Sequence, residues 1–365
     1  MLTAVTSAFQ SFWNDVVYNG VTSPSSVLHR PSSIRRPSQP TYSPITQAFT
    51  PSPYDVQHAR LLLVRGLGLP VEIVDLVIDA AQYWPIVVGT TTAVGTVPLR
   101  SGSAGRGRGG VGVGVGIGGS GVVRSSDTRM NQAAQLVVVT GAVPADEEVG
   151  EEGPGWEGLR KVKVQGARWW TRSRDQGWVS EGVGRRGTYS GSSSWFDACI
   201  LRPLDPSIPR PPLNPEVASR IEQMMQRNLP LSSEFFPHFL IGNLLSHDPE
   251  DARELFCGLG WDFVERVERV EVDGEVGERR GVLWKVQANV VAGREYTVHE
   301  GEWRKSGDEW TGGEASDDGN EGSGDGTGFV DVLKPGDRVG IWARAMFPGW
   351  VNDVDEVKVE IRYSV

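Results

Sequence analysis

The sequence predicts an all-β fold, a two-layer antiparallel sandwich that runs from about residue 156 to the C-terminus of the 365-residue chain. Eleven of the 13 tryptophans lie at Trp156 or beyond, and large aromatic side chains contribute most to a buried core. Short segments of the same region alternate polar and apolar residues, which is typical of strands with one buried face. Much of the remaining sequence is glycine, proline and serine, a composition that predicts long disordered regions.

The clearest strand lies at the C-terminus. There Val357, Val359, Ile361 and Tyr363 alternate with charged residues, which predicts an antiparallel strand with one face in water. The segment 195–201 is apolar on both faces, as expected of a buried strand. Further strands are predicted at 161–164, 282–290, 296–303 and 338–347.

Two segments interrupt the predicted sandwich. The first, at about 203–281, begins with a proline-rich link and is expected to hold a helical insertion, with a helix from Asn214 to Asn228. The second, at 304–328, is an acidic, glycine-rich loop that is expected to lie in solvent. Neither segment adds strands to the prediction.

Three segments precede the predicted sandwich. Residues 1–56 are a Ser/Pro-rich tail that is expected to be disordered, and residues 57–85 predict a short helical segment. Residues 86–155 are expected to be a glycine-rich, low-complexity linker. Within that linker, QLVVVTGAV at 135–143 is a candidate strand.

The helical segment carries one apolar stripe. Pro70 suits the first helical turn, and Pro85 ends the helix. An isolated helix of this length is marginal in water, so we expect the stripe to dock either on the sandwich or on another protein. The candidate partner-binding residues are Ile73, Val74, Val77 and Ile78.

Composition restricts the partners and the compartment. A formal net charge of −10 argues against nucleic acid as the main partner, because binding phosphates needs a basic surface. Cys199 and Cys257 alone supply neither a disulfide framework nor a metal site, which favours a reducing compartment, cytoplasmic or nuclear. No apolar stretch reaches the roughly 20 residues needed to span a bilayer. We therefore expect no membrane segment and no cofactor.

Two segments are rich in side chains that can hold a ligand. TRSRDQGW at 171–178 combines guanidinium, carboxylate, amide and indole groups within one predicted short loop, and the aromatic segment at 336–352 adds others. Such a set can bind a sugar or a peptide through bidentate hydrogen bonds and an apolar ring. In the structural alternative, the arginines and Asp175 pair with each other, or with Asp337 and Arg344, and fix loops. The candidate ligand-binding residues are Arg172, Arg174, Asp175, Gln176, Trp178, Tyr189, Trp350 and Asn352.

Together with WKVQAN at 284–289, these two segments resemble the recurring motifs of a group of fungal proteins, in which a helix like LPVEIV at 69–74 often comes first. No function carries over from that group. The same helix ahead of a β-sandwich is also similar to F-box proteins that carry a galactose-binding-like domain. That resemblance implies a jelly-roll sandwich, and it implies that the helical segment binds the adaptor of a ubiquitin ligase.

Three hypotheses about function follow. The favoured one is a non-catalytic binding or scaffolding protein that recognises a polar ligand, either a protein or a carbohydrate, at one end of the sandwich. The second is an F-box-like substrate receptor of a ubiquitin ligase, with residues 58–84 as the adaptor-binding element. The third is a carbohydrate-active hydrolase, which needs two carboxylates roughly 5 to 9.5 Å apart. An enzyme is not expected, because His238, His247 and His299 lack metal-ligand spacing and neither cysteine has an activating neighbour.

Overall fold

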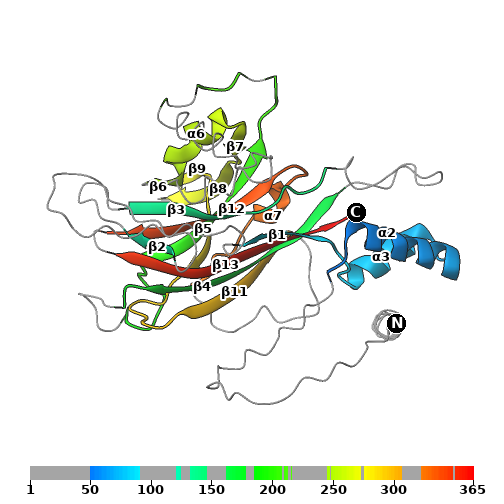
Figure 1. Ribbon diagram of the computed structural model, residues 1–365, viewed down its shortest axis with the longest axis horizontal. Coiled ribbons are helices and arrows are strands. Elements are labelled where there is room, and N and C mark those ends of the chain that lie inside the picture. The colour runs from blue at the N-terminus through cyan, green and yellow to red at the C-terminus, as the bar shows by residue number, and fades with distance from the viewer. Residues whose placement is uncertain are drawn as a thin grey trace, which may run out of the picture. The chain divides into compact units, whose positions relative to one another are not determined.

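The chain divides into two compact units, which are residues 1–85 and residues 86–365 (Figure 1). No described helix is long and apolar enough to cross a membrane. The computed structural model describes residues 50–90, 121–124, 132–145, 162–177, 185–207, 209–212, 215, 245–246, 248–272, 275–305, 322–347 and 350–365.

The described part of the first unit is helical. Helix α2 (Pro53–Leu61) continues into the π-helical turn η2 (Leu62–Gly66), and α3 (Val71–Ala80) follows. Gly68 lies between them with a φ of +66°, a left-handed backbone that suits glycine and ends helices. The predicted helical segment is therefore two helices, and the first of them begins before residue 57.

Local contacts explain where these helices begin and how they meet. Ser52 caps α2, because its hydroxyl accepts from the Asp55 amide at 3.2 Å while the Asp55 carboxylate accepts from the Ser52 amide at 2.8 Å. Arg60 of α2 pairs with Asp75 of α3 at 2.7 Å. The buried apolar residues of this unit are Val56, Ala59, Leu63, Val74 and Ile78.

The second unit is an antiparallel β-sandwich, as the sequence predicts. Its first sheet, sheet A, has the order β1-β13-β4-β11, and a further strand, β2, also pairs with β13. Figure 1 shows β13, β4 and β11 side by side. The strands of sheet A are β1 (Ile86–Thr90), β2 (Gly121–Arg124), β4 (Lys163–Asp175), β11 (Thr297–Arg304) and β13 (Val351–Ser364).

The second sheet, sheet B, has the order β10-β5-β12-β3-β6, and β7 pairs with one end of β5. Its central strand β12 lies between β5 and β3 and is buried on both faces. The strands of sheet B are β3 (Gln132–Val139), β5 (Ser194–Pro203), β6 (Leu245–Ser246), β7 (Trp261–Phe263), β10 (Trp284–Ala288) and β12 (Arg338–Met346).

The main strand pairs of the sandwich are nested along the chain. The first strand, β1, pairs with the last, β13, and β3 pairs with β12. Inside these, β4 pairs with β11 and β5 pairs with β10. All four pairs are antiparallel, so the sandwich is assembled from contacts between residues that are far apart in sequence. The alternation at 357–363 is confirmed for its apolar face, since Val357, Val359, Ile361 and Tyr363 are buried. The opposite face is only partly in water, because Glu360 is buried too.

The expected linker at 86–155 contributes strands to both sheets, which corrects the prediction. Strands β1 and β2 belong to sheet A, and β3 belongs to sheet B. The candidate strand at 135–143 overlaps β3, which begins earlier, at Gln132, and ends at Val139. Short strands whose partners lie more than 200 residues away leave little local signal, which explains the error.

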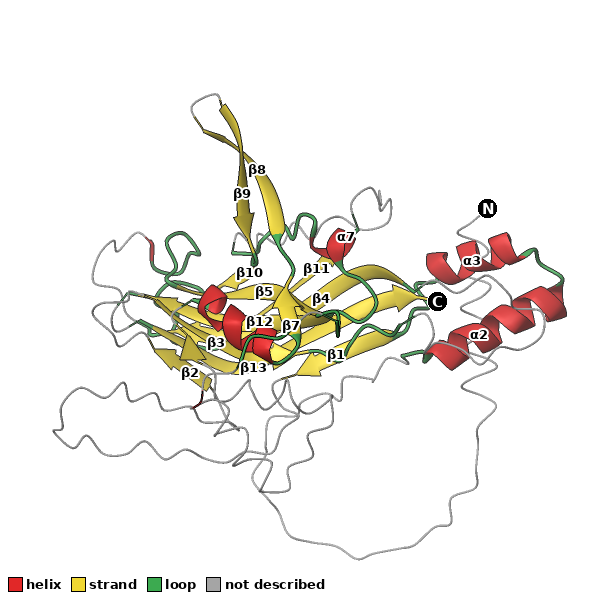
Figure 2. Ribbon diagram, turned by 90° about the horizontal axis from the view of Figure 1, so that it is seen from above, coloured by secondary structure: helices red, strands yellow, loops and turns green. Residues whose placement is uncertain are grey.

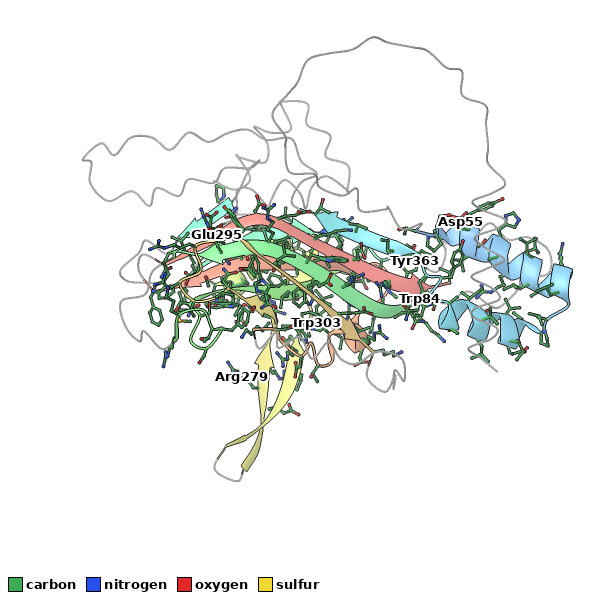
Figure 3. All side chains as sticks on the ribbon, turned by 90° about the horizontal axis from the view of Figure 1, so that it is seen from below. Asp55, Trp84, Arg279, Glu295, Trp303 and Tyr363 are labelled. Atoms are coloured by element: carbon green, nitrogen blue, oxygen red, sulfur yellow. The ribbon has the colours of Figure 1, made fainter. Side chains whose placement is uncertain are left out.

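The expected helical insertion at 203–281 contains more strand than helix where it is described. It contains the turn η6 (Pro249–Ala252), helix α6 (Arg253–Gly258) and a hairpin of β8 (Arg266–Val272) and β9 (Glu275–Gly281). Figure 2 shows this hairpin projecting from the sandwich, and Figure 3 shows Arg279 on it. Apart from Pro215, the helix predicted at 214–228 lies outside the described residues.

Helix α6 and β7 cover the outer face of sheet B. Phe256 of α6 and Phe263 of β7 pack with 5.2 Å between ring centroids, in one apolar cluster with Leu201 and Trp342 of the sheet. This cover explains why β12 is buried on both faces although its sequence alternates arginines and apolar residues. It also makes the segment 249–263 part of the folded body.

Aromatic rings fill one half of the space between the sheets. Phe329, at the start of helix α7 (Phe329–Val332), lies between Trp284 of sheet B and Trp303 of sheet A. The ring centroids are 5.1 and 4.8 Å from that of Phe329, both in edge-to-face geometry. We call Trp284, Trp303 and Phe329 the aromatic half of the interior.

Candidate functional site

Three connections meet at one end of the sandwich, which we call the loop end. They link β4 to β5, β10 to β11 and β12 to β13. Hydrogen bonds join them, since the Val291 amide donates to the Thr188 carbonyl at 2.8 Å and the Val351 amide donates to Gln176 Oε1 at 3.1 Å. Figure 3 labels Glu295 at this end and Tyr363 near the opposite one. The candidate ligand-binding residues thus come from connected segments.

The segment around Arg172 is a strand, whereas the sequence analysis placed it in one short loop. Residues 171–175 continue β4, which is paired with β11 on one side and β13 on the other. Successive side chains therefore alternate between the two faces. Thr171, Ser173 and Asp175 are buried on the inner face, while Arg172 and Arg174 lie on the outer face.

The two arginines form an outer cluster with Tyr296, Asp353 and Asp355. Arg174 pairs with Asp353 at 2.8 Å, and the Tyr296 hydroxyl donates to the same carboxylate at 2.9 Å. Arg172 pairs with Asp355 at 2.9 Å. The guanidinium of Arg174 lies 4.5 Å from the centroid of the Tyr296 ring, and that of Arg172 lies 5.8 Å from it.

The two arginines of the outer cluster face two aspartates, and the arginine side chains are partly exposed to solvent. The hydrogen bond to Asp353 raises the pKa of Arg174, so this guanidinium stays charged. The side chains of Arg172 and Arg174 are 41% and 40% exposed. Among the described residues, the Asp355 pair engages Nη1 of Arg172, whereas a guanidinium has five N–H donors. Arg172 can therefore accept a further anionic group.

On the inner face, four buried side chains form a polar chain between the two sheets. The Ser173 hydroxyl of sheet A donates to Asn289 Oδ1 at 2.7 Å. Asn289 Nδ2 donates to Ser194 Oγ of sheet B and to Asn352 Oδ1 of sheet A, each at 2.9 Å. Asn352 Nδ2 then donates to the carbonyl of Trp195 at 2.9 Å. We call these side chains, Ser173, Ser194, Asn289 and Asn352, the inner polar chain.

Asp175 holds a turn. Its buried carboxylate accepts from the amides of Ala292 at 3.0 Å and of Gln176. Ala292 has a φ of +55°, a left-handed conformation that is uncommon outside glycine, and the bond to Asp175 stabilises it. Burial raises the pKa of Asp175. The position and contacts of this carboxylate fit a structural role in the β10–β11 turn.

Tyr189 lies against a buried histidine. Its hydroxyl is 2.9 Å from Nε2 of His299, and the two rings meet edge to face with centroids 5.5 Å apart. Burial lowers the pKa of His299 to about 4 and raises that of Tyr189. Both groups are therefore neutral at neutral pH. The sequence gives His299 no metal-ligand spacing, but the structure shows that its side chain is buried and that Nδ1 has no partner among the described residues.

The remaining candidate ligand residues are distributed over the loop end. Gln176 binds the Val351 amide, and Asn352 belongs to the inner polar chain. Trp350 is half-buried, and its amide donates to the Phe347 carbonyl at 3.2 Å. Trp178 lies outside the described residues. Arg172 and Arg174 are thus the two candidates that the structure places on an exposed sheet face.

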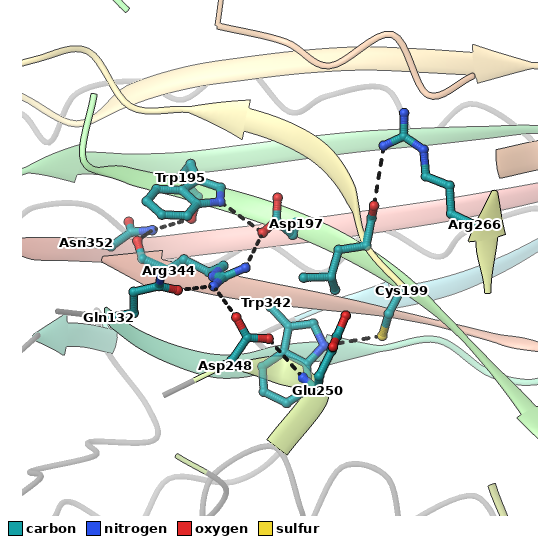
Figure 4. Close-up of polar contacts among 11 residues, drawn as sticks. Gln132, Trp195, Asp197, Cys199, Asp248, Glu250, Arg266, Trp342, Arg344 and Asn352 are labelled. Carbon is teal, nitrogen blue, oxygen red and sulfur yellow. Dashed lines mark hydrogen bonds and ion pairs between the residues drawn. The ribbon is translucent and has the colours of Figure 1, made fainter. Parts of the chain in front are cut away.

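The structural alternative named the wrong partners for these arginines. Asp337 pairs with Arg202 at 2.7 Å, and its carboxylate is fully buried. Arg344 belongs to a separate network on the outer face of sheet B, which Figure 4 shows. It donates to Asp197 and Asp248, each at 3.0 Å, and to Gln132 at 2.7 Å. Burial raises the pKa of Asp197 in spite of this pairing.

Sequence reasoning missed Tyr296 and Asn289. Asp353 and Asp355 were not among the candidate residues either. The cross-strand register of β4 with β13 brings Asp353 opposite Arg174, and this register depends on a pairing across nearly 180 residues. The one local signal was the opposite charge of the two strands.

In the helical unit, the four candidate partner-binding residues differ in their exposure to solvent. Val74 and Ile78 are buried, Val77 is half-buried and Ile73 is exposed. Other large apolar side chains of this unit are more exposed than Ile73, namely Leu62, Leu67 and Leu76 at 51%, 69% and 62%. The apolar surface of the unit is therefore carried mainly by leucines that were not on the candidate list.

Among the described residues, no group of three or more histidine, cysteine or acidic side chains is placed to hold a metal ion. Comparison of the chain with protein-family models, with curated proteins and with solved structures finds no match.

Proposed function

We propose that the chain is a non-catalytic binding protein whose loop end recognises an acidic segment of a partner protein. The observation that carries this proposal is the outer cluster, where Arg172 and Arg174 are half-exposed on a paired strand and held by Asp355, Asp353 and Tyr296. Guanidinium groups bind carboxylates in planar, bidentate geometry, which favours acidic side chains as ligands.

The position of the cluster favours binding further. Its residues lie at the loop end of sheet A, on its two central strands β4 and β13 or next to β11. Ion pairs and the Tyr296 ring restrict the rotamers of both arginines before a ligand arrives. Fixed side chains lose less conformational entropy on binding, so a preorganised cluster binds more tightly than the same groups on a mobile loop.

The sandwich itself we infer to be a jelly roll of the galactose-binding-like kind. A jelly roll has eight strands in two sheets with Greek-key connections. The support is the nesting of β1 with β13, β3 with β12, β4 with β11 and β5 with β10. In such sandwiches the connections at one end form the natural place for a ligand, which agrees with a site at the loop end.

The test uses the full chain and two arrays, one of peptides and one of glycans. A peptide array with acidic, neutral and basic sequences is probed alongside a glycan array, and the hits are measured by titration. Arg172→Ala is expected to weaken binding of an acidic peptide at least tenfold, because one charge-assisted bidentate contact is lost. Arg279→Ala, which removes an exposed arginine from the projecting hairpin, is the matched control and should leave binding unchanged.

Two outcomes would overturn this proposal. Equal weakening by Arg172→Ala and Arg279→Ala would show that net charge, rather than the outer cluster, attracts the peptide. Hits confined to neutral glycans would instead assign the loop end to carbohydrate.

A second candidate function is that of an F-box-like substrate receptor, and the apolar surface of the helical unit favours it. Leu62, Leu67 and Leu76 are each more than half exposed. Exposed apolar side chains that gather on a small helical unit mark a protein interface. Capture of the ubiquitin-ligase adaptor by the full chain, and its loss in Leu62→Asp and Leu76→Asp, would support this function; no capture by the unmodified chain would exclude it.

A further inference from the structure

Three buried polar atoms on the inner face of sheet A have no hydrogen-bond partner among the described residues. They are Nε1 of Trp169, Oγ1 of Thr171 and Nδ1 of His299. The three residues are 2%, 1% and 5% exposed, so solvent does not reach these atoms. Buried polar groups in native proteins are nearly always paired, with protein or with ordered water.

The register of β4 and β11 brings the three side chains to neighbouring positions. His299 is the direct partner of Thr171, and Gly301 is the direct partner of Trp169. Paired strands lie about 4.7–4.9 Å apart, and same-face neighbours are two residues apart along a strand. The three side chains therefore occupy adjoining positions on one face of two paired strands.

The Trp169 ring extends from β4 across the neighbouring strand β11. A Cβ atom at Gly301 would lie 2.6 Å from Cε2 of Trp169, the ring atom to which Nε1 is bonded. The indole thus lies across Gly301, toward the strand that carries His299. Nδ1 of His299 and Oγ1 of Thr171 are both close to their own backbones, since each is at most two bonds from Cβ. The three side chains that carry the unpartnered atoms thus adjoin one another on the inner face of β4 and β11.

We propose that Trp169, Thr171 and His299 form an internal site that binds one water molecule. Trp169 Nε1 only donates, so the bound molecule must offer a lone pair. The Thr171 hydroxyl both donates and accepts, and His299 Nδ1 does one or the other according to the tautomer that Tyr189 selects at Nε2. Water satisfies all three atoms, whichever tautomer is present.

The surroundings select a neutral molecule. The inward side chains beyond Thr171 on β4 are Ser173 and the carboxylate of Asp175, which disfavours an anion. An indole N–H and a neutral imidazole offer a cation at most one lone pair, so a cation is disfavoured as well. Internal waters typically form about three hydrogen bonds, which is the number of atoms gathered at this site.

Replacing Thr171 by valine tests the site, because the sign of the effect separates the two cases. If Oγ1 had no partner at all, valine would remove an unpaired buried hydroxyl and stabilise the fold. If Oγ1 binds water, Thr171→Val is expected to lower the folding equilibrium constant about fivefold or more, measured by urea unfolding of the full chain. Thr171→Ser keeps the hydroxyl but loses a methyl group. It should nevertheless be more stable than Thr171→Val.

Thr297→Val is the matched control, since Thr297 is half-exposed on the same strand as His299 and reports the effect of valine in a strand without the site. A direct readout is magnetisation transfer from water to the indole N–H of Trp169, expected in the wild type and lost in Thr171→Val. A Thr171→Val variant at least as stable as the wild type, or absence of transfer, would overturn the site. Electron density larger than a single oxygen atom at this position would overturn the choice of water.

Discussion

The two halves of the sandwich interior are held together by different forces. In the aromatic half, Trp284 and Trp303 pack against Phe329, and both indole N–H groups donate to backbone carbonyls. In the half at the loop end, the inner polar chain joins the sheets through hydrogen bonds between fully buried side chains. Both halves lie between the same two sheets and are equally closed to solvent.

The two halves differ in how strictly they fix the positions of the strands. Apolar packing is non-directional and tolerates substitutions that keep the volume. A buried amide is satisfied only when each partner stands at the right distance and angle, and an unpaired one costs free energy. We therefore expect the aromatic half to supply most of the stability, and the inner polar chain to fix the position of the strands that carry the outer cluster.

The largest effect is expected in the aromatic half. Trp284→Ala should lower the free energy of unfolding by about 3–5 kcal/mol, because the ring is fully buried and leaves a large cavity. Trp284→Phe should recover most of that loss. Urea unfolding of both variants checks the expectation, and a loss below about 1 kcal/mol for the alanine variant would contradict it.

Substitutions in the inner polar chain should lower the free energy of unfolding less than Trp284→Ala does. An apolar side chain of similar volume should not restore the lost stability. Asn289→Ala removes the partner of Ser173, Ser194 and Asn352, and we expect it to lower the free energy of unfolding by roughly 2–3 kcal/mol. Asn289→Leu restores the volume but not the hydrogen bonds, so it should be no more stable than Asn289→Ala. A leucine variant close to the wild type would remove the distinction between the two halves.

A pH titration tests the polar region through His299. Burial lowers the pKa of His299 to about 4, so the folded chain keeps the imidazole neutral while the unfolded chain protonates it below about pH 6.5. Acid thus favours the unfolded state, and the contribution of His299 to stability falls by on the order of 2 kcal/mol between about pH 7 and pH 5. The control is His299→Gln, in which this part of the pH dependence should be missing.

Comparing wild type with His299→Gln separates the contribution of His299 to the pH dependence of stability from the contributions of the buried carboxyl groups. Burial raises the pKa of Asp175 and of Asp197, so their contributions change in the opposite direction and are common to both proteins. If wild type and His299→Gln lost the same free energy on acidification, His299 would not be the buried neutral group described above.

The smallest effect on stability is expected at the surface. Arg174→Ala removes a partly exposed ion pair with Asp353 and should change the free energy of unfolding by less than about 1 kcal/mol. In the peptide titration the same variant should weaken binding as Arg172→Ala does. A large loss of stability would show instead that the outer cluster holds the fold together.

Local patterns predicted part of this architecture. The alternation in β13 and the apolar run in β5 identified two strands, because their signals lie within a few residues. Strand β1 was assigned to a linker and β3 was only a candidate strand within it, since their main partners, β13 and β12, lie more than 200 residues away. Glycine density in the same region concealed them further.

The site was harder to predict than the strands. TRSRDQG was interpreted as one loop that gathers its polar groups, whereas alternation in β4 sends Arg172 and Asp175 to opposite faces. The decisive contacts of both residues, with Asp355 and with the Ala292 amide, depend on strand pairing and on a distant turn. Residue types alone identified the right segment but not the arrangement.

The pairing of β1 with β13 has a consequence for synthesis of the chain. Ile86 lies opposite Arg362, so β1 can pair with β13 only after β13 has left the ribosome. Until then β4 also lacks one of its two neighbours. The sandwich should accordingly complete its folding only after β13 has been made, and until then the exposed edges of β1 and β4 are the places where a chaperone would have to act on the nascent protein.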